Sequence, residues 1–192
     1  MEEKSFWTRF WGHLHTINHH KMLVMGLCFR CGMWKQGLLH DLSKYSYVEF
    51  SNGIHYWQGG VRSPNVAERD EKGYAEAWIH HKGRNKHHWQ YWTDNVKNAP
   101  DLHPVVMPDN YFLESICDRI AACKNYNKSA YTDWDPLNYF LNTQERYGMH
   151  PEDAKRTEIL LRYLGENGEE KALRWYKELY HQYKRGIPFT LS

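Results

Sequence analysis

A histidine and an aspartate stand side by side at His40 and Asp41, behind an apolar run and ahead of Lys44. Imidazole and carboxylate groups are common ligands of transition-metal ions. Neighbouring residues of an α-helix point about 100° apart, so this pair cannot share one outward helix face. The two side chains can bind one ion only from the end of a helix or from inside a bundle. The pair therefore predicts a buried metal site, although a helix-end histidine followed by a local cap would give the same dipeptide.

The chain carries 13 histidines in 192 residues, and one of them is a candidate for the first ligand. His20 precedes Val24 by four residues, which puts it on the helix face that turns toward the core. His13 lies seven residues earlier on nearly the same stripe and stays open as an alternative first ligand. We expect His15 and His19 to lie at the surface.

A second dense stretch, residues 80–88, holds four histidines and three cations. Such a composition makes a poor core and a costly surface unless a metal ion or a negative group binds there. We expect at least one further ligand or acid/base group from it. His81 and His88 are the preferred ligands, because residues seven apart share a helix face, and His80 and His87 are the candidate acid/base groups. A solvated basic loop is the alternative.

Asp118 is the last candidate ligand, and it lies beside the apolar stripe of a long predicted helix. An aspartate on a mostly apolar helix either pairs with a cation such as Arg119 or holds a metal. Judged alone, Asp118 favours the ion pair. Taken with the other candidates, it predicts that four residues converge on one ion: His20, His40, Asp41 and Asp118.

Composition limits the partners of the protein. With 25 basic and 23 acidic residues the net charge is +2, so the chain lacks the broad basic field of a general nucleic-acid binder. Aromatic residues make up 16% and could stack on bases, yet the near-neutral charge argues against this partner. There is no run of about 18 apolar residues and no signal peptide at the N-terminus, so we expect a cytoplasmic protein with no membrane partner.

The elements that position these residues are all expected to be helices, in one domain over residues 1–192. The metal site is assigned to residues 13–125 and the C-terminal packing helices to 126–192. Residues 65–73 fit either a mobile surface segment or a helix with a solvent-exposed polar face. No strand is predicted. The spacing of apolar residues predicts the following helices: about 5–31, 33–40, 46–57, 109–126, 135–147, and an antiparallel pair over 158–164 and 172–183. The fold class is therefore an all-α bundle.

Two local features have simple structural interpretations. Glu49 lies three residues after Ser46, which fits a capping box at the start of a helix. The four cysteines fall within predicted helices and are expected to be small core residues that stay reduced: Cys28, Cys31, Cys117 and Cys123.

The order of the candidate ligands resembles the HD-domain superfamily. Its members hold one or two metal ions with a histidine, a His-Asp doublet and a distal aspartate on a helical bundle, so the resemblance implies this fold and this ligand set. The string HDLSK at 40–44 resembles the His-Asp-x-x-Lys form of its phosphohydrolase branches. Only the paired histidines at 80–81 match the HD-GYP phosphodiesterase motif, which weighs against a cyclic dinucleotide substrate. The strings HDLSKYS, HHKGRNKHH and CDRIAA also resemble a small uncharacterised family of short bacterial and phage proteins.

Such a site predicts hydrolysis of a nucleotide or another small phosphate ester. Nitrogen and oxygen donors with a bridging carboxylate suit one or two Mn, Fe, Ni or Zn ions better than Mg. A metal held in this way lowers the pKa of its bound water toward about 7 and supplies hydroxide for attack on phosphorus. Lys44 and Arg84 would neutralise the phosphoryl oxygens. We expect Lys44 to contact a phosphate rather than a surface carboxylate.

Two other classes of function stay open. A histidine-rich version of the superfamily's site can activate O₂, so the second class is a di-iron oxygenase. The abundance of histidine favours it, whereas Lys44 and the basic residues in 82–86 favour a phosphate substrate. The third class is a non-catalytic binding protein that the metal stabilises.

Overall fold

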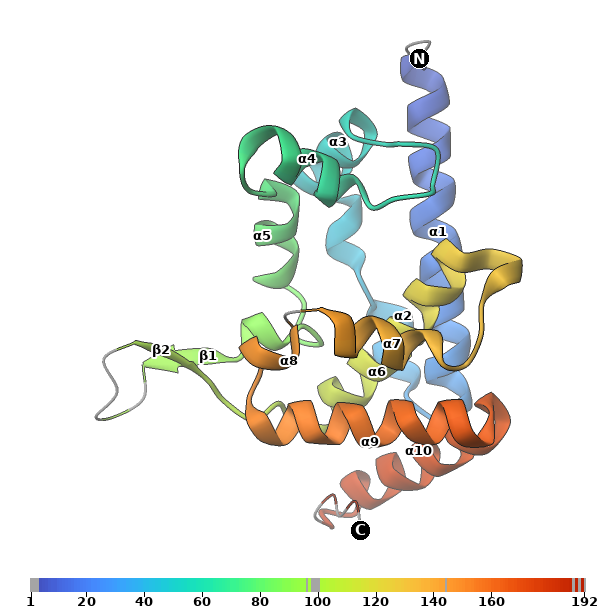
Figure 1. Cartoon of the computed structure of the whole chain (residues 1–192), viewed down its shortest axis with the longest axis vertical. Helices are drawn as coiled ribbons and strands as arrows, with labels where there is room; N and C mark the ends of the chain where they lie inside the picture. Colours follow the sequence, from blue (N-terminus) through green and yellow to red (C-terminus); the bar gives the residue numbers. More distant parts are fainter. Residues whose placement is uncertain are drawn as a thin grey trace.

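The structure, a computed structural model, describes residues 4–95, 97, 101–143, 145–187, 189 and 191. It is a single bundle of mostly α-helices, as the sequence predicted (Figure 1). The first half contains α1 (Phe6–Arg30), α2 (Trp34–Leu39), the 3₁₀-helix η1 (Leu42–Tyr45), α3 (Tyr47–His55), α4 (Pro64–Lys72) and α5 (Glu76–Lys82). The second half contains η2 (Trp89–Tyr91), β1 (Thr93–Asn95), β2 (Leu102–Pro104), α6 (Asp109–Asn127), η3 (Lys128–Ala130), α7 (Asp135–Asn142), α8 (Glu145–Gly148), α9 (Pro151–Asn167) and α10 (Glu169–Lys184). In the described part of the chain, no helix is both long and apolar enough to cross a membrane.

Helix α1 runs along most of the molecule, with its N-terminus at one end of the bundle (Figure 1). Its first turn is capped because the hydroxyl of Ser5 accepts the N–H of Thr8 at 3.2 Å. Beyond its end, Gly32 takes a positive φ of 80°, which a glycine adopts at little cost. One face of α1 is buried and carries two of the histidines of interest: His13, Ile17, His20, Val24, Leu27 and Cys28.

Helix α6 is the central element of the bundle and packs against α1, α9 and α10. It is buried around most of its circumference, with Phe112, Ile116 and Ile120 fully enclosed. An apolar helix enclosed in this way has little freedom to shift, since interiors are close-packed. Glu114 and Asp118 are carried by this helix, so their positions are fixed by the core.

Two glycines allow α1 and α3 to approach closely. A Cβ on Gly12 would lie 2.2 Å from the indole of Trp57, and a Cβ on Gly53 would lie 2.1 Å from the ring of His13. Both are well inside van der Waals contact, so any larger residue would push the two helices apart. The absence of these side chains lets His13 and Trp57 fill the space between the helices.

The C-terminal pair, α9 and α10, closes one end of the bundle (Figure 1). The antiparallel pair is confirmed, but the turn is shorter than predicted, because Gly165 still lies within α9. Gly168 makes the turn with a φ of 80°. The hydroxyl of Tyr176 donates to the carbonyl of Leu160 at 2.6 Å and joins the two helices.

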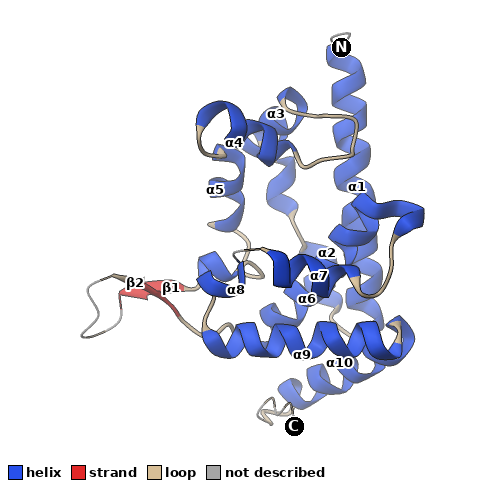
Figure 2. Ribbon diagram, in the orientation of Figure 1, coloured by secondary structure: helices blue, strands red, loops and turns tan. Residues whose placement is uncertain are grey.

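The structure also bears on the expected absence of strands, on the segment 135–147 and on residues 65–73. The expectation of no strand was wrong, because β1 and β2 pair antiparallel and project from the helices (Figure 2). Strands of three residues are too short to show a clear alternation of apolar and polar residues. The segment 135–147, predicted as one helix, forms α7 and α8 separately. Residues 65–73, left open between surface segment and helix, form most of α4.

Arg156 joins the start of α9 to the segment before α6. It is 7% exposed and donates to Asp153 and to Asp109, each at 2.8 Å. Asp153 is fully buried and also accepts the N–H of Met107 at 2.9 Å. The ion pair therefore satisfies a carboxylate that has no access to water.

We expect Arg156→Met to lower the free energy of unfolding by about 3–5 kcal/mol, because it leaves Asp153 buried without its cation. Urea unfolding followed by circular dichroism would measure the loss. Arg162→Met is the matched control: it removes an exposed pair with Glu158 and should cost less than about 1 kcal/mol. Equal losses in the two variants would contradict this role of Arg156.

Candidate metal centre

The His40-Asp41 pair lies where α2 ends. His40 has φ −51° and ψ 128°, and Asp41 takes the left-handed conformation with φ 53° and ψ 29°. Aspartate is one of the few residues besides glycine that visits this region. The change of backbone direction between α2 and η1 lets two consecutive side chains face one interior site. The sequence allowed a position at the end of a helix or inside the bundle, and the pair has both: it lies at the end of α2 and Asp41 is only 2% exposed.

The four residues predicted to converge do so. Donor atoms of His20, His40, Asp41 and Asp118 all lie within 4.8 Å of one another. The Nε2 atom of His20 is 3.0 Å from Oδ1 of Asp118, and Nε2 of His40 is 3.3 Å from Oδ2 of Asp41. We call these four residues the first donor group.

A second donor group shares Asp41 and draws on the histidine cluster. Asp41, His81, His87 and His88 also place donor atoms within 4.8 Å of one another. The Nε2 atoms of His81 and His87 each lie 3.3 Å from Oδ1 of Asp41. The cluster thus contributes three imidazoles to the centre.

Two carboxylates connect the donor groups. Asp41 turns Oδ2 toward His40 of the first group and Oδ1 toward His81 and His87 of the second. Asp118 places Oδ1 near His20 and Oδ2 3.9 Å from Nε2 of His87. A carboxylate with one oxygen toward each group could bind an ion on either side.

Two further carboxylates lie behind the histidines. Oε1 of Glu114 is 3.0 Å from Nδ1 of His40 and 3.2 Å from Nδ1 of His87. Oε2 of Glu49 is 2.7 Å from Nδ1 of His81. Holding Nδ1 in this way turns each Nε2 toward the centre, as the outer partners of metal-binding histidines commonly do.

Burial and nearby charges shift the pKa values at the centre. Burial, with the positive charge of Lys44, lowers the pKa of His20. Burial and the neighbouring His87 hold the pKa of His88 well below its usual value. Both imidazoles are therefore neutral, which is the form that binds metal. Burial opposes a charge on His40, but Asp41 and other carboxylates outweigh it and raise the pKa of His40.

The residues present fit divalent transition-metal ions. Carboxylates of Asp41, Glu49, Glu114 and Asp118 gather in a space where unbalanced negative charge is costly. Buried polar atoms that lack a hydrogen bond of suitable geometry within the described residues also gather here: His20 Nε2, His40 Nε2, Asp41 Oδ1, His87 Nε2 and His88 Nε2. Metal ions would satisfy both requirements, and imidazole with carboxylate suits borderline transition ions.

Lys44 lies at the centre, although its contact differs from the expected one. Its Nζ atom is 2.6 Å from Oδ2 of Asp41, one turn of η1 away. Burial opposes its charge, but Asp41 and Asp118 outweigh burial and raise the pKa of Lys44. The lysine thus pairs with a carboxylate, but with a buried candidate ligand rather than one at the surface. Its predicted contact with a phosphate stays a prediction.

The structure separates the other members of the 80–88 stretch. Helix α5 ends at Lys82 with Gly83 as its cap, and the chain then folds into turns. Helical spacing therefore does not apply across the stretch. His87, predicted as an acid/base group, lies among the donors, while His80 lies outside both groups with Nδ1 2.7 Å from Oε1 of Glu49.

Two further expectations were wrong. Arg84 is exposed and does not line the cavity at the centre; Arg119 of α6 lines it instead. Arg84 lies in the turn that follows α5 and its side chain is exposed, whereas His87 and His88, a few residues further on, belong to the second donor group. The capping box is absent as well, because Ser46 makes no side-chain cap bond and the Glu49 carboxylate is held by His80 and His81.

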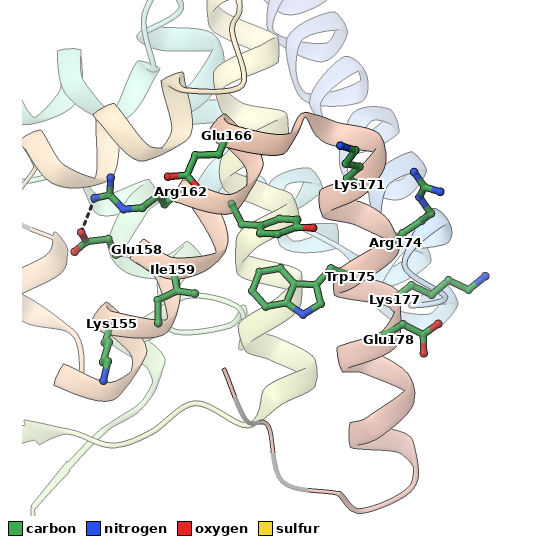
Figure 3. A pocket seen from close by; sticks show the side chains of 11 residues that line it. Lys155, Glu158, Ile159, Arg162, Glu166, Lys171, Arg174, Trp175, Lys177 and Glu178 are labelled. Atoms are coloured by element: carbon green, nitrogen blue, oxygen red, sulfur yellow. Dashed lines mark hydrogen bonds and ion pairs between the residues drawn. The ribbon is translucent and has the colours of Figure 1, made fainter. Parts of the chain in front are cut away.

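The centre opens into a cavity of about 490 Å³, lined mainly by α1, the loop before α4, α5 and α6. This volume is within the range of about 300–1,000 Å³ for small-molecule sites. A larger groove of about 1,150 Å³ lies between α9 and α10, where Tyr163 and Trp175 meet among side chains of both charges (Figure 3). The groove is lined by no histidine, so the chemistry described above belongs to the first cavity.

The fold and the site together define a mostly helical protein with a buried histidine and carboxylate centre that could hold metal ions. The chain belongs to a family described as being of unknown function (DUF5662), and the match covers residues 9–162. This range contains both donor groups. No curated protein and no solved structure matches the chain.

We expect the purified protein to bind two divalent transition-metal ions per chain, and His88→Ala to bind one, because His88 belongs only to the second donor group. Elemental analysis after loading with Mn or Fe would measure the count. His103→Ala, on the exposed face of β2, is the control and should keep both ions. Circular dichroism should be the same for all three proteins. A variant that keeps both ions would argue against a ligand role for His88.

We expect Glu114→Gln to weaken metal binding by about 10–100-fold, because the amide cannot hold Nδ1 of His40 and His87 as a carboxylate does. Competition with a chromophoric chelator would measure the affinity. Glu158→Gln, at the exposed pair on α9, is the control and should bind metal like the wild type. If the two variants bind metal equally well, Glu114 does not orient the ligands.

Proposed function

We propose that this protein is a metal-dependent phosphohydrolase of the HD-domain type, acting on a nucleotide or another small phosphate ester. The observation that carries the proposal is Asp41, which turns one oxygen to each donor group and has the ammonium of Lys44 2.6 Å from Oδ2. Two groups of donors with a cation beside them suit a phosphate bound across two ions. The order of ligands along the chain supports the HD type.

The residues of this chain divide the chemical task. Bound ions would lower the pKa of a water molecule toward about 7 and polarise the phosphoryl group. Lys44 would bind a non-bridging phosphoryl oxygen and stabilise the charge that develops there. Arg119, which follows Asp118 on α6, lines the same cavity and would add a second positive charge. The buried walls would limit the access of competing water.

The cavity favours a small substrate over a polymer. Its volume of about 490 Å³ suits a molecule of metabolite size. The net charge of +2 supplies no extended basic surface for a nucleic acid. We therefore propose a free phosphate ester as the substrate class.

A di-iron oxygenase is the second candidate, and one observation favours it. The two donor groups together contain five imidazoles but only two carboxylates, those of Asp41 and Asp118. A donor set so rich in imidazole suits iron well. Elemental analysis with an optical spectrum separates the candidates: two irons with charge-transfer bands and O₂ uptake would favour the oxygenase, whereas phosphate release with Mn, Ni or Zn would favour the hydrolase.

The proposal is tested by assaying phosphate release from p-nitrophenyl phosphate and a panel of phosphate monoesters. Each divalent ion is added separately to metal-free protein. Release that depends on the ion and is lost in Asp41→Asn would support the hydrolase. A protein that binds metal, gains thermal stability and turns over none of these esters would support the non-catalytic class instead.

We expect Lys44→Met to keep its metal content and to lower the rate of phosphate release by about 10²–10³-fold, the effect of removing one charge-stabilising donor. Steady-state kinetics and elemental analysis on the same sample would measure both quantities. Lys35→Met, at an exposed position of α2, is the matched control and should retain the wild-type rate. An unchanged rate in Lys44→Met would remove Lys44 from the mechanism.

A further inference from the structure

His13 lies in the wall of the cavity but belongs to neither donor group. This corrects its role as an alternative first ligand. It lies seven residues before His20 on α1, and a helix rises about 1.5 Å per residue, so the two are about 10 Å apart along the axis. Since both histidines line one cavity, the organic part of an ester bound at the donor groups can extend along the cavity toward His13.

The structure makes room for this imidazole. Gly53, inside α3, faces the ring so closely that a Cβ would lie 2.1 Å from Nε2 of His13. A glycine inside a helix is less stable there than alanine. The ring also packs against Phe50, with centroids 5.4 Å apart. His13 is therefore held in a fixed position at the cavity wall.

His13 is buried without satisfying its hydrogen-bonding capacity. It is 6% exposed, and its Nδ1 atom has no hydrogen-bond partner within the described residues. Leaving a buried polar atom without a hydrogen bond destabilises the fold. Among the described residues, Ile17 on the same face of α1 and Phe50 on α3 are apolar and make no hydrogen bond to the ring. A group from outside the chain would account for it.

The chemistry of that group follows from the charge on the ring. Burial and the nearby Lys44 lower the pKa of His13 to about 4, so the ring is neutral near pH 7. A neutral imidazole has one donor and one acceptor nitrogen. It matches a hydroxyl or amide, which can donate and accept, better than a second phosphate, which binds preferentially to cations.

We propose that His13 recognises an uncharged hydrogen-bonding group on the organic part of the substrate, at a point of the cavity wall about 10 Å along α1 from His20. The inference rests on the proposed function, because it takes the metal centre as the place where the phosphate binds. The substrate class is therefore a phosphate monoester whose organic part carries a distal hydroxyl or amide. Esters with a second anionic group at that distance are disfavoured.

Two matched probes test the inference by binding. In 7-hydroxyheptylphosphonate a terminal hydroxyl stands where octylphosphonate has a methyl group, and both chains reach about as far as His13. The P–C bond of a phosphonate cannot be hydrolysed, so binding is measured without turnover. Calorimetry on the metal-loaded protein gives the ratio of the two dissociation constants, with inorganic phosphate as a third ligand. We expect His13→Phe to reduce the preference for the hydroxyl probe by about 5–10-fold, the effect of one lost hydrogen bond, and to leave phosphate binding unchanged.

His13→Gln is the control, since glutamine can both donate and accept and should retain part of the preference. Metal content and melting temperature are measured for both variants. An equal ratio in wild type, His13→Phe and His13→Gln would overturn the role of His13 while leaving hydrolysis intact. Failure of the metal-loaded wild type to bind inorganic phosphate would instead overturn the proposed function, and this inference with it.

Discussion

Removing the carboxylate of Asp41 from water is costly in free energy unless positive charge or metal ions surround it. The chain meets this constraint with groups from several elements: His20 from α1, His81 from α5, and Lys44 from η1. Each must arrive within a few ångströms of the same two oxygens. The arrangement of helices around α6 is best understood as the framework that brings them there.

That framework separates rigid parts from adaptable ones. Asp118, which connects the donor groups, and Glu114, which holds two histidines, are carried by α6, so the core fixes their positions. His87 and His88 come from turns after α5, where the backbone can adopt angles that a helix forbids. The Glu114 carboxylate, held on α6, thus orients the imidazole of His87, which comes from an irregular segment. Its contact with Nδ1 of His87 holds the ring where no regular helix does so.

The sequence predicted the helical fold and the first donor group because each of those residues has the type and order of a ligand. Glu114 and Glu49 could not be identified, since a glutamate on a helix has several local explanations and its partner histidines are distant in sequence. A signal existed for Glu114, which lies one turn before Asp118 and near the apolar residues Leu113 and Ile116 of the same helix. Which histidines of the 80–88 stretch belong to a donor group depended on where α5 ends. Sequence periodicity does not locate the end of a helix reliably.

Glu114 touches one histidine from each donor group, His40 and His87, while Asp41 belongs to both. An ion bound to one donor group therefore fixes side chains that the other donor group shares or contacts. The positive charge of that ion also repels a second ion. Filling of the two positions is thermodynamically linked, and the linkage is reciprocal. The two positions would then not fill independently. Metal would bind over a narrower range of metal concentration than at independent sites if the shared ligands dominate, and over a wider range if repulsion between the ions dominates.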